Sequence, residues 1–294
     1  MRLVVANWKM NCDKVSASRL VSAVMEAFTG NITCDIGVVE VVFCPPYVYL
    51  GIISAMLNNS SSYQSSCTSI HPPLPYDNSV VTIENLDSIE AACNITNYSS
   101  ELSLKFTLGA QDVSEYCEYG PHTGQVNSRM LFDLGCKYSI VGHSECRIAK
   151  PESNLSISKK VCSLLKSKVT PIICVGESTQ QRNSGTYINE ILDQLHGSIH
   201  LLDTESISDM IIAYEPLWSI GSGNIPTPSD INEVATVIKN HYTGIKFLYG
   251  GSVNSSNISM LSSIHSIDGI LVGNASLDAH EFTKIIRAVS YKEK

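Results

Sequence analysis

Short runs of β-branched and other apolar residues recur eight times along the chain, and a longer amphipathic stretch follows nearly every run. Runs with almost no charge are typical of strands buried on both faces, as in parallel sheets. Strand–helix units repeated in this way predict a closed (β/α)8 barrel or, as the alternative, a doubly wound open sheet. The length of 294 residues favours the barrel. The predicted strands are 2–6, 38–44, 106–110, 138–141, 171–175, 210–214, 246–249 and 269–272.

Helical periodicity marks the stretches between these runs. Helices are predicted over 15–28, 154–165 and 228–241. The last begins with Thr227 as its N-cap residue and Pro228 in the first helical position, and it stops near Gly244. We therefore expect residues 1–294 to form a single barrel domain.

Residues 58–103 interrupt the alternation between the second helix and the third strand. This stretch opens with Asn-Asn-Ser-Ser-Ser and contains Pro72-Pro73-Leu74-Pro75, a composition typical of an insert. Residues 83–93 carry apolar side chains at helical spacing and predict one short helix against the barrel. Because the insert connects a helix to a strand, we expect it at the end of the barrel opposite the carboxyl ends of the strands.

Composition argues against several classes of function. The net charge of −8 disfavours nucleic acid and anionic membranes as partners, and no apolar run approaches the roughly 18 residues of a membrane helix. A strand-like run begins at Leu3, so we expect no signal peptide and a cytoplasmic protein. The ten cysteines include no Cys-x-x-Cys and the eight histidines no His-Glu-x-x-His motif, so we expect reduced thiols and no metal or cofactor.

A carboxylate stands at the end of the sixth predicted strand. The apolar run 210–214 ends at Glu215, and the chain then breaks into a segment bounded by Pro216 and by Gly221 and Gly223. A residue that leaves a buried strand at its C-terminal end faces a cleft, and the segment after it could close over that cleft as a lid. Glu215 is therefore a candidate general base, and a solvent-exposed carboxylate is the alternative.

Polar groups also follow the first and fourth strands. Asn7 and Lys9 place an amide and an ammonium group two residues apart, on one face if the strand continues; a solvated surface lysine is the alternative. His143 follows Gly142 at the start of a predicted short helix, whose dipole favours a neutral imidazole that donates a hydrogen bond. The alternative is a loop histidine whose ring nitrogens are hydrogen-bonded within the protein and which has no catalytic role.

Glycine-rich segments follow the last two strands. They read Tyr249-Gly250-Gly251-Ser252 and Gly273-Asn274-Ala275. Backbone N–H groups at such exits can converge on a phosphate, although glycine also serves ordinary turns.

Together these segments resemble the triosephosphate isomerase family, whose fold is the TIM barrel. The resemblance covers residues 1–57 and about 104–290 and rests on at least five motifs in the family's order. It implies interconversion of dihydroxyacetone phosphate and D-glyceraldehyde 3-phosphate through an enediolate, in glycolysis and gluconeogenesis, without cofactor or metal.

The resemblance also implies roles for single residues. Glu215 is implied to be the base and His143 the electrophile, and Lys9 is implied to bind substrate together with Asn7. Backbone phosphate ligands are implied at Gly221, Ser252, Gly273 and Asn274. Supporting roles are implied for Glu145 as the partner of Lys9, for Tyr249 as a latch of the lid, and for Thr123, which reaches into the neighbouring site of a homodimer.

Several residues depart from the family pattern. Cys146 and Asp112 stand in place of an arginine and an asparagine, Asn274 replaces a glycine of the phosphate site, and His122 and Gln125 alter the loop around Thr123. None of these changes removes a catalytic group. The alternative function is a barrel scaffold or binding protein with reduced activity that uses the insert as its contact surface.

Overall fold

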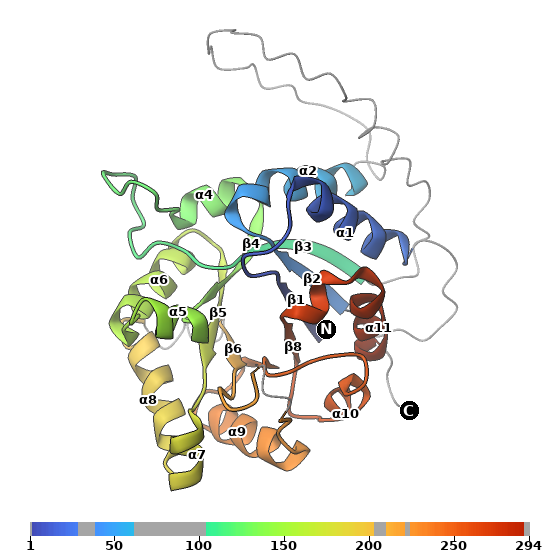
Figure 1. Cartoon of the computed structure of the whole chain (residues 1–294). Helices are drawn as coiled ribbons and strands as arrows, with labels where there is room; N and C mark the ends of the chain where they lie inside the picture. Colours follow the sequence, from blue (N-terminus) through green and yellow to red (C-terminus); the bar gives the residue numbers. More distant parts are fainter. Residues whose placement is uncertain (1, 29–38, 62–103, 203–209, 221–223, 291–294) are drawn as a thin grey trace, which may run out of the picture.

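The computed structural model describes residues 2–28, 39–61, 104–202, 210–220 and 224–290. Within these ranges eight parallel strands follow one another around a closed barrel, and β1 pairs with both β2 and β8. Figure 1 looks along the barrel and shows the helices arranged around the ring of strands. The predicted (β/α)8 barrel is confirmed.

The strands are β1 (Arg2–Asn7), β2 (Val39–Cys44), β3 (Leu104–Ala110), β4 (Cys136–Val141), β5 (Thr170–Val175), β6 (Ile211–Tyr214), β7 (Lys246–Tyr249) and β8 (Gly269–Val272). The helices are α1 (Lys14–Glu26), η1 (Tyr47–Tyr49), α2 (Leu50–Ser61), α4 (Ser128–Asp133), α5 (Ser144–Ala149), α6 (Asn154–Lys166), α7 (Thr179–Ser184), α8 (Tyr187–Ile199), α9 (Pro228–His241), α10 (Ile258–Ser262), η4 (Asn274–Leu277) and α11 (Ala279–Ser290).

The largest difference from the predicted elements is at the end of α2. This helix continues to Ser61, so residues 58–61 of the predicted insert are helical. Their polar side chains hide the continuation from a reading of apolar spacing, and Asn58 lies exposed with its amide 3.5 Å from the hydroxyl of Ser54. Residues 62–103, with the predicted helix 83–93, lie outside the described residues.

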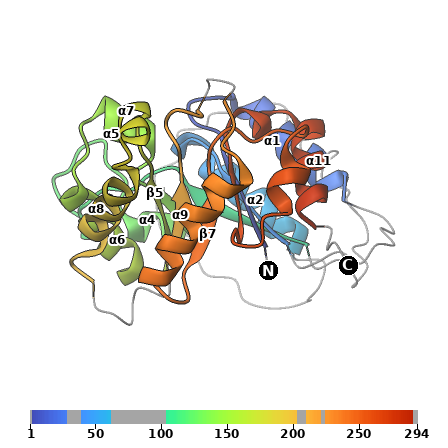
Figure 2. The ribbon, with the colours of Figure 1, turned by 90° about the horizontal axis from the view of Figure 1, so that it is seen from below.

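Strand alternation divides the core into two layers. Side chains at alternate positions, such as Leu3 and Val5 on β1, fill the inside of the barrel, and those between them, such as Val4 and Ala6, pack outward against the helices. The helices form an outer layer in which α6 contacts α8, α8 contacts α9, and α1 contacts α2 and α11. Figure 2 shows this layer from the side, with α9 and α11 running along the barrel.

The seam between β1 and β8 requires a glycine. A Cβ atom at Gly269 would lie 2.0 Å from the carbonyl oxygen of Leu3, which is far inside van der Waals contact. Leu3 and Gly269 are paired in the register of the two strands. The absence of a side chain at Gly269 therefore allows the first and last strands to close the barrel.

Two further expectations concern the described residues. The cysteines in the described ranges are all free thiols. In the same ranges no helix combines the length and the apolar character needed to span a membrane.

Candidate active site

A cavity of about 360 Å³ opens at the carboxyl ends of the strands. Its lining combines residues from the exits of β1, β4, β6, β7 and β8. These include eight of the residues singled out in the sequence: Asn7, Lys9, His143, Glu145, Glu215, Ser252, Gly273 and Asn274. Segments that are far apart in the chain thus contribute to one site.

Glu215 is the most enclosed charged group of the cavity. It is only 2% exposed, and its two carboxylate oxygens lie 3.0 Å from Nε2 of His143 and 2.9 Å from the backbone nitrogen of Ser144. Burial by itself raises the pKa of Glu215, but His143, the Ser144 N–H and Lys9 lower it, and the net shift is downward. The carboxylate is therefore held in its ionised form.

His143 lies at the N-terminus of α5, as predicted. The backbone N–H of Glu145 donates to Nδ1 at 3.2 Å, so this nitrogen presents a lone pair and the proton lies on Nε2, facing Glu215. Burial lowers the pKa of His143, but the carboxylates of Glu215 and Glu145 raise it by more. The N-terminus of α5 therefore selects the tautomer of His143. The sequence argument considered only the helix dipole, which favours the neutral imidazole, whereas Glu215 favours the charged form.

Lys9 has a left-handed backbone with φ of 54°. Its ammonium group pairs with Oε1 of Glu145 at 2.7 Å, and its backbone nitrogen donates to the side-chain oxygen of Asn7 at 3.1 Å. The side-chain amide of Gln111 donates to the carbonyl oxygen of Lys9 at 2.8 Å and to that of Cys44 at 2.9 Å. A non-glycine residue in this conformation is uncommon and needs such support.

Gln111 is a supporting residue that the sequence argument missed. It directly follows β3, the same strand-end position that identified Asn7 and Glu215. Its place in the chain was therefore a usable signal. The hydrogen-bond partners of Gln111 could not be predicted from the sequence, because they lie at the ends of two other strands, β1 and β2.

Glycine-rich segments after the last two strands also line the cavity. Gly250, Gly251 and Ser252 follow β7, and Gly273 and Asn274 follow β8. A Cβ atom at Gly273 would lie 3.6 Å from Cε of Lys9, so this backbone comes close to the lysine side chain. Glycine-rich segments beside an ammonium group suit an anionic ligand, because their backbone N–H groups can approach it closely.

Three of the predicted site residues are not among the described residues that line the cavity. Tyr249 is buried, and its hydroxyl lies 3.4 Å from that of Ser219, which donates to the carbonyl oxygen of Asn224 at 2.7 Å. Thr123 is exposed on the long loop between β3 and α4, which extends away from the barrel in Figure 1. Gly221 lies outside the described residues.

Two of the departures from the family pattern lie at a partly buried charge cluster outside this cavity. Asp112 pairs with the ammonium group of Lys160 at 2.6 Å, and Lys160 also pairs with Glu152. Burial lowers the pKa of Lys160, but the two carboxylates raise it by more, so the lysine stays charged. Burial also raises the pKa of the Cys146 thiol, and Asp112 and Glu152 add to that shift.

Two further departures, His122 and Gln125, lie on the protruding loop, whereas Asn274 lines the cavity. The ring of His122 stacks on Tyr116 with centroids 3.7 Å apart. Gln125 accepts a hydrogen bond from the hydroxyl of Ser114. The altered side chains thus stabilise the loop itself.

No group of three or more His, Cys, Asp or Glu side chains within the described ranges is arranged to hold a metal ion. The chemistry of the cavity is that of a carboxylate, an imidazole, an ammonium group and backbone amides.

Comparison with known proteins points to one family. The profile described as triosephosphate isomerase matches residues 2–71 and 86–289, so the match is interrupted only within the predicted insert. Triosephosphate isomerase of Nitrosococcus oceani is 32% identical over 294 aligned residues, which cover 97% of this chain and 98% of that protein. The protein of the same name from Saccharopolyspora erythraea is 34% identical, with 96% of this chain and 94% of that protein covered. The crystal structure of triosephosphate isomerase from Bartonella henselae superposes with a TM-score of 0.71 at 26% identity and covers 98% of both chains.

Proposed function

Because the chain belongs to the triosephosphate isomerase family, we propose that the cavity at the strand ends is its active site. The protein interconverts dihydroxyacetone phosphate and D-glyceraldehyde 3-phosphate, a step of glycolysis and gluconeogenesis. In this site Glu215 is the base, His143 and Lys9 stabilise the charge that develops on the substrate oxygens, and Asn7 helps to orient the substrate. The observation that carries the assignment is the contact between the buried Glu215 carboxylate and Nε2 of His143 on one wall of the cavity.

The reaction needs a proton moved between two neighbouring carbons. Glu215 removes the proton next to the carbonyl group and returns it to the adjacent carbon. The N–H at Nε2 of His143 and the ammonium group of Lys9 stabilise the negative charge on the oxygens of the enediolate. A second proton has to pass between the two oxygens: Nε2 of His143 gives its proton to the carbonyl oxygen and takes the proton of the neighbouring hydroxyl group. With these transfers Glu215, His143 and Lys9 supply every proton and charge that the interconversion requires.

Binding of substrate changes the environment of Glu215. In the structure the N–H of His143 lies against a carboxylate oxygen, and this contact lowers the pKa of Glu215. A substrate carbonyl oxygen that accepts the same N–H releases Glu215 from it, while burial continues to raise the pKa of the carboxyl group. The base therefore becomes stronger once the substrate is in place.

The phosphate group of the substrate lies beside the glycine-rich segments that follow β7 and β8. Backbone N–H groups of Ser252, Gly273 and Asn274 are its proposed ligands there, with Gly221 as a further ligand. The segment from Pro216 to Ile225 acts as the lid, and the hydroxyls of Tyr249 and Ser252 hold it closed. Exclusion of water strengthens the interactions of His143 and Lys9 with the intermediate.

The active form is a homodimer in which Thr123 completes the site of the other subunit, with Glu145 keeping Lys9 in place. Support comes from large apolar side chains exposed on the segments that follow β1, β2 and β3: Met10 is 95% exposed, Val48 80% and Tyr119 64%. Highly exposed large apolar side chains are typical of protein interfaces when they gather on one surface. The chain is a single domain, and its glycolytic role supports a cytoplasmic location.

A coupled assay tests the function directly. Turnover of glyceraldehyde 3-phosphate to dihydroxyacetone phosphate is measured through oxidation of NADH by glycerol-3-phosphate dehydrogenase. Isomerase activity at least a thousandfold above a protein-free control is expected; a value at background would support the scaffold function instead.

A further inference from the structure

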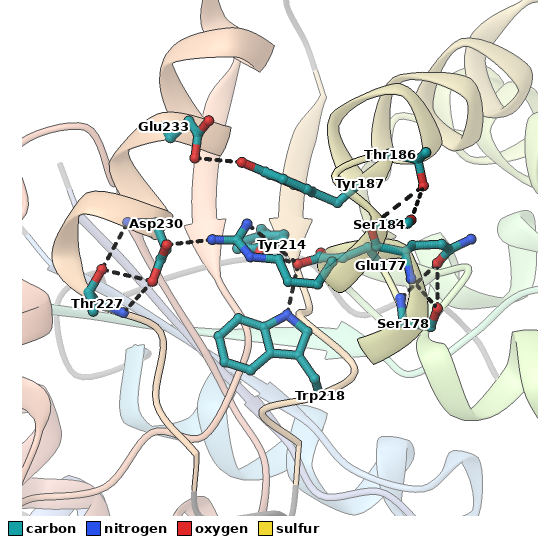
Figure 3. A network of polar contacts seen from close by, with 12 residues as sticks. Glu177, Ser178, Ser184, Thr186, Tyr187, Tyr214, Trp218, Thr227, Asp230 and Glu233 are labelled. Carbon is teal, nitrogen blue, oxygen red and sulfur yellow. Dashed lines mark hydrogen bonds and ion pairs between the residues drawn. The ribbon is translucent and has the colours of Figure 1, made fainter.

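Glu177 connects the residues on either side of Glu215. Its carboxylate oxygen Oε1 accepts hydrogen bonds from the hydroxyl of Tyr214 at 3.0 Å and from Nε1 of Trp218 at 2.8 Å. Its carbonyl oxygen accepts from the backbone nitrogen of Leu217 at 3.0 Å. Figure 3 shows Tyr214 and Trp218 directed at Glu177. The residue before Glu215 and the second and third residues after it are therefore held by one side chain and its backbone.

The backbone of Glu215 also contacts the exit of β5 directly. Its nitrogen donates to the carbonyl oxygen of Val175 at 2.8 Å. A Cβ atom at Gly176 would lie 1.9 Å from the carbonyl oxygen of Glu215, so only glycine allows this approach. Since Glu177 follows Gly176, a shift of Glu177 is transmitted to the base.

Arg182 of α7 is the cation nearest to the Glu177 carboxylate among the ion pairs of the described residues. Its Nη1 lies 3.8 Å from Oε1 of Glu177, and its guanidinium carbon lies 4.1 Å from the ring centroid of Tyr187 and 5.7 Å from that of Trp218. Stacking between two aromatic rings fixes the plane of a guanidinium group. The charge of Arg182 is therefore held beside Glu177 and Trp218.

The same guanidinium group reaches the start of α9. Its Nη2 pairs with Oδ1 of Asp230. The other oxygen of Asp230 accepts from the backbone nitrogen of Thr227 at 2.9 Å and from its hydroxyl at 2.7 Å, as part of the N-terminal cap of α9 (Figure 3). Arg182 thus links the two ends of the connection that runs from Glu215 to Thr227.

Glu177 needs a cation to remain ionised in this environment. The residue is fully buried, and its Oε2 has no hydrogen-bond partner within the described ranges. Burial raises the pKa of Glu177, whereas Trp218, Tyr214 and the charge of Arg182 lower it by a smaller amount. Removal of Arg182 takes away the only one of these compensating groups that carries a charge.

We propose that Arg182 is a positioning residue for the isomerase reaction: its guanidinium group keeps Glu177 an acceptor for Tyr214 and Trp218 and so holds Glu215 against the substrate. Arg182 is not among the residues that line the cavity, so it acts through its contacts with Glu177, Trp218 and Asp230. The inference rests on the proposed role of Glu215.

Three variants test this inference. Arg182→Met keeps the length of the side chain and removes the charge, and Arg182→Lys restores the charge. The matched control is Lys239→Met. Lys239 lies on α9, as Asp230 does, and pairs with Asp268 at 2.7 Å, so this variant removes an ion pair that involves neither Arg182 nor Glu177. The kinetic constants kcat and KM for glyceraldehyde 3-phosphate are measured between pH 5.5 and pH 8.5.

Arg182→Met is expected to lower kcat about tenfold or more at pH 7, because a small displacement of a catalytic group has a large effect on rate. The value of KM stays within about threefold of wild type, because the phosphate ligands on β7 and β8 are untouched. Its kcat falls further towards acid pH as Glu177 gains a proton, and the emission of Trp218 changes with the same midpoint. Arg182→Lys recovers most of kcat, and its kcat varies with pH as that of the wild type does.

Two results would overturn the inference. One is an Arg182→Met protein of lowered thermal stability whose kcat and pH profile match those of Lys239→Met. The other is a folded Arg182→Lys protein that is as slow as Arg182→Met. If Arg182→Met does not fold, Glu177→Gln replaces it as the test: this variant has no carboxyl group to protonate, and loss of its kcat without any acid-side dependence is expected. An unchanged kcat in Glu177→Gln would refute the inference. Activity of the wild type and of Lys239→Met tests the proposed function independently.

Discussion

Replacement of Glu215 by glutamine separates the chemistry of the base from its role in folding. Glutamine has nearly the same shape but cannot accept a proton from carbon. A positioned general base contributes a factor of about 10²–10⁴ to the rate. At about 1.4 kcal/mol for each factor of ten, the barrier to the chemical step rises by about 3–5 kcal/mol.

The contacts of Glu215 predict the effect on stability as well. The amide oxygen of the variant can still accept the N–H of Ser144, which lies 2.9 Å from the carboxylate in the wild type. The amide NH₂ group then faces the N–H at Nε2 of His143, and the second tautomer of His143 is opposed by the Glu145 N–H at Nδ1. A buried pair of donors without an acceptor costs about 1–3 kcal/mol of unfolding free energy.

The assay compares Glu215→Gln with the wild type and with Glu233→Gln, which makes the same chemical change on α9 where Glu233 accepts the hydroxyl of Tyr187 at 2.8 Å. We expect kcat/KM of Glu215→Gln to fall at least about a hundredfold and its melting temperature to fall by a few degrees. Exchange of the substrate proton in D₂O should slow in parallel. A folded Glu215→Gln protein with turnover within tenfold of the wild type would remove Glu215 from the mechanism.

Three further predictions concern pH, assembly and the insert. The pKa of Glu215 in the folded protein is lower than its ordinary value of 4.5. The ionised carboxylate therefore stabilises the fold above pH 4.5, and this stabilisation is lost as the pH falls through the lowered pKa. The difference in melting temperature between the wild type and Glu215→Gln should shrink below pH 4.5. Met10→Asp places a charge on a side chain that is 95% exposed among the interface loops, so sedimentation should show monomers with reduced kcat, and a fully active monomer would contradict the dimer proposal. Replacement of residues 72–85 by a short Gly/Ser linker should leave kcat and KM within a few-fold, because the connection from Ser61 to Leu104 joins the barrel at the opposite end from Glu215; a folded protein with little activity would refute this placement.

The fold could be predicted because its information is local. The runs that became β7 and β8 have the predicted bounds, since charge-poor segments between turn residues mark strands without knowledge of their partners. The N-cap Thr227 and Pro228 fixed the start of α9 in the same way. The end of α2 could not be read, because its last turn carries only polar residues.

The site could be predicted only as a set of strand-end residues. Asn7, His143 and Glu215 each follow an apolar run, and barrel closure places all such positions at one end. Their contacts with one another depend on side-chain directions that no local pattern specifies. The left-handed backbone of Lys9 and the Gln111 contact that supports it arise from three different strands, so they were missed.

The pairing of β1 with β8 makes the order of the strands circular. Contacts of α1 with α11 bring the first and last helices side by side as well. Consider a chain that starts at Leu104 and runs to Ser290, where a linker joins it to Arg2, and that then runs on to Ser61. This chain would contain every strand and every pairing of the present barrel. New termini between Ser61 and Leu104 would then leave every described strand and helix uninterrupted. The architecture is defined by neighbours around a ring, and the position of the first residue is independent of it.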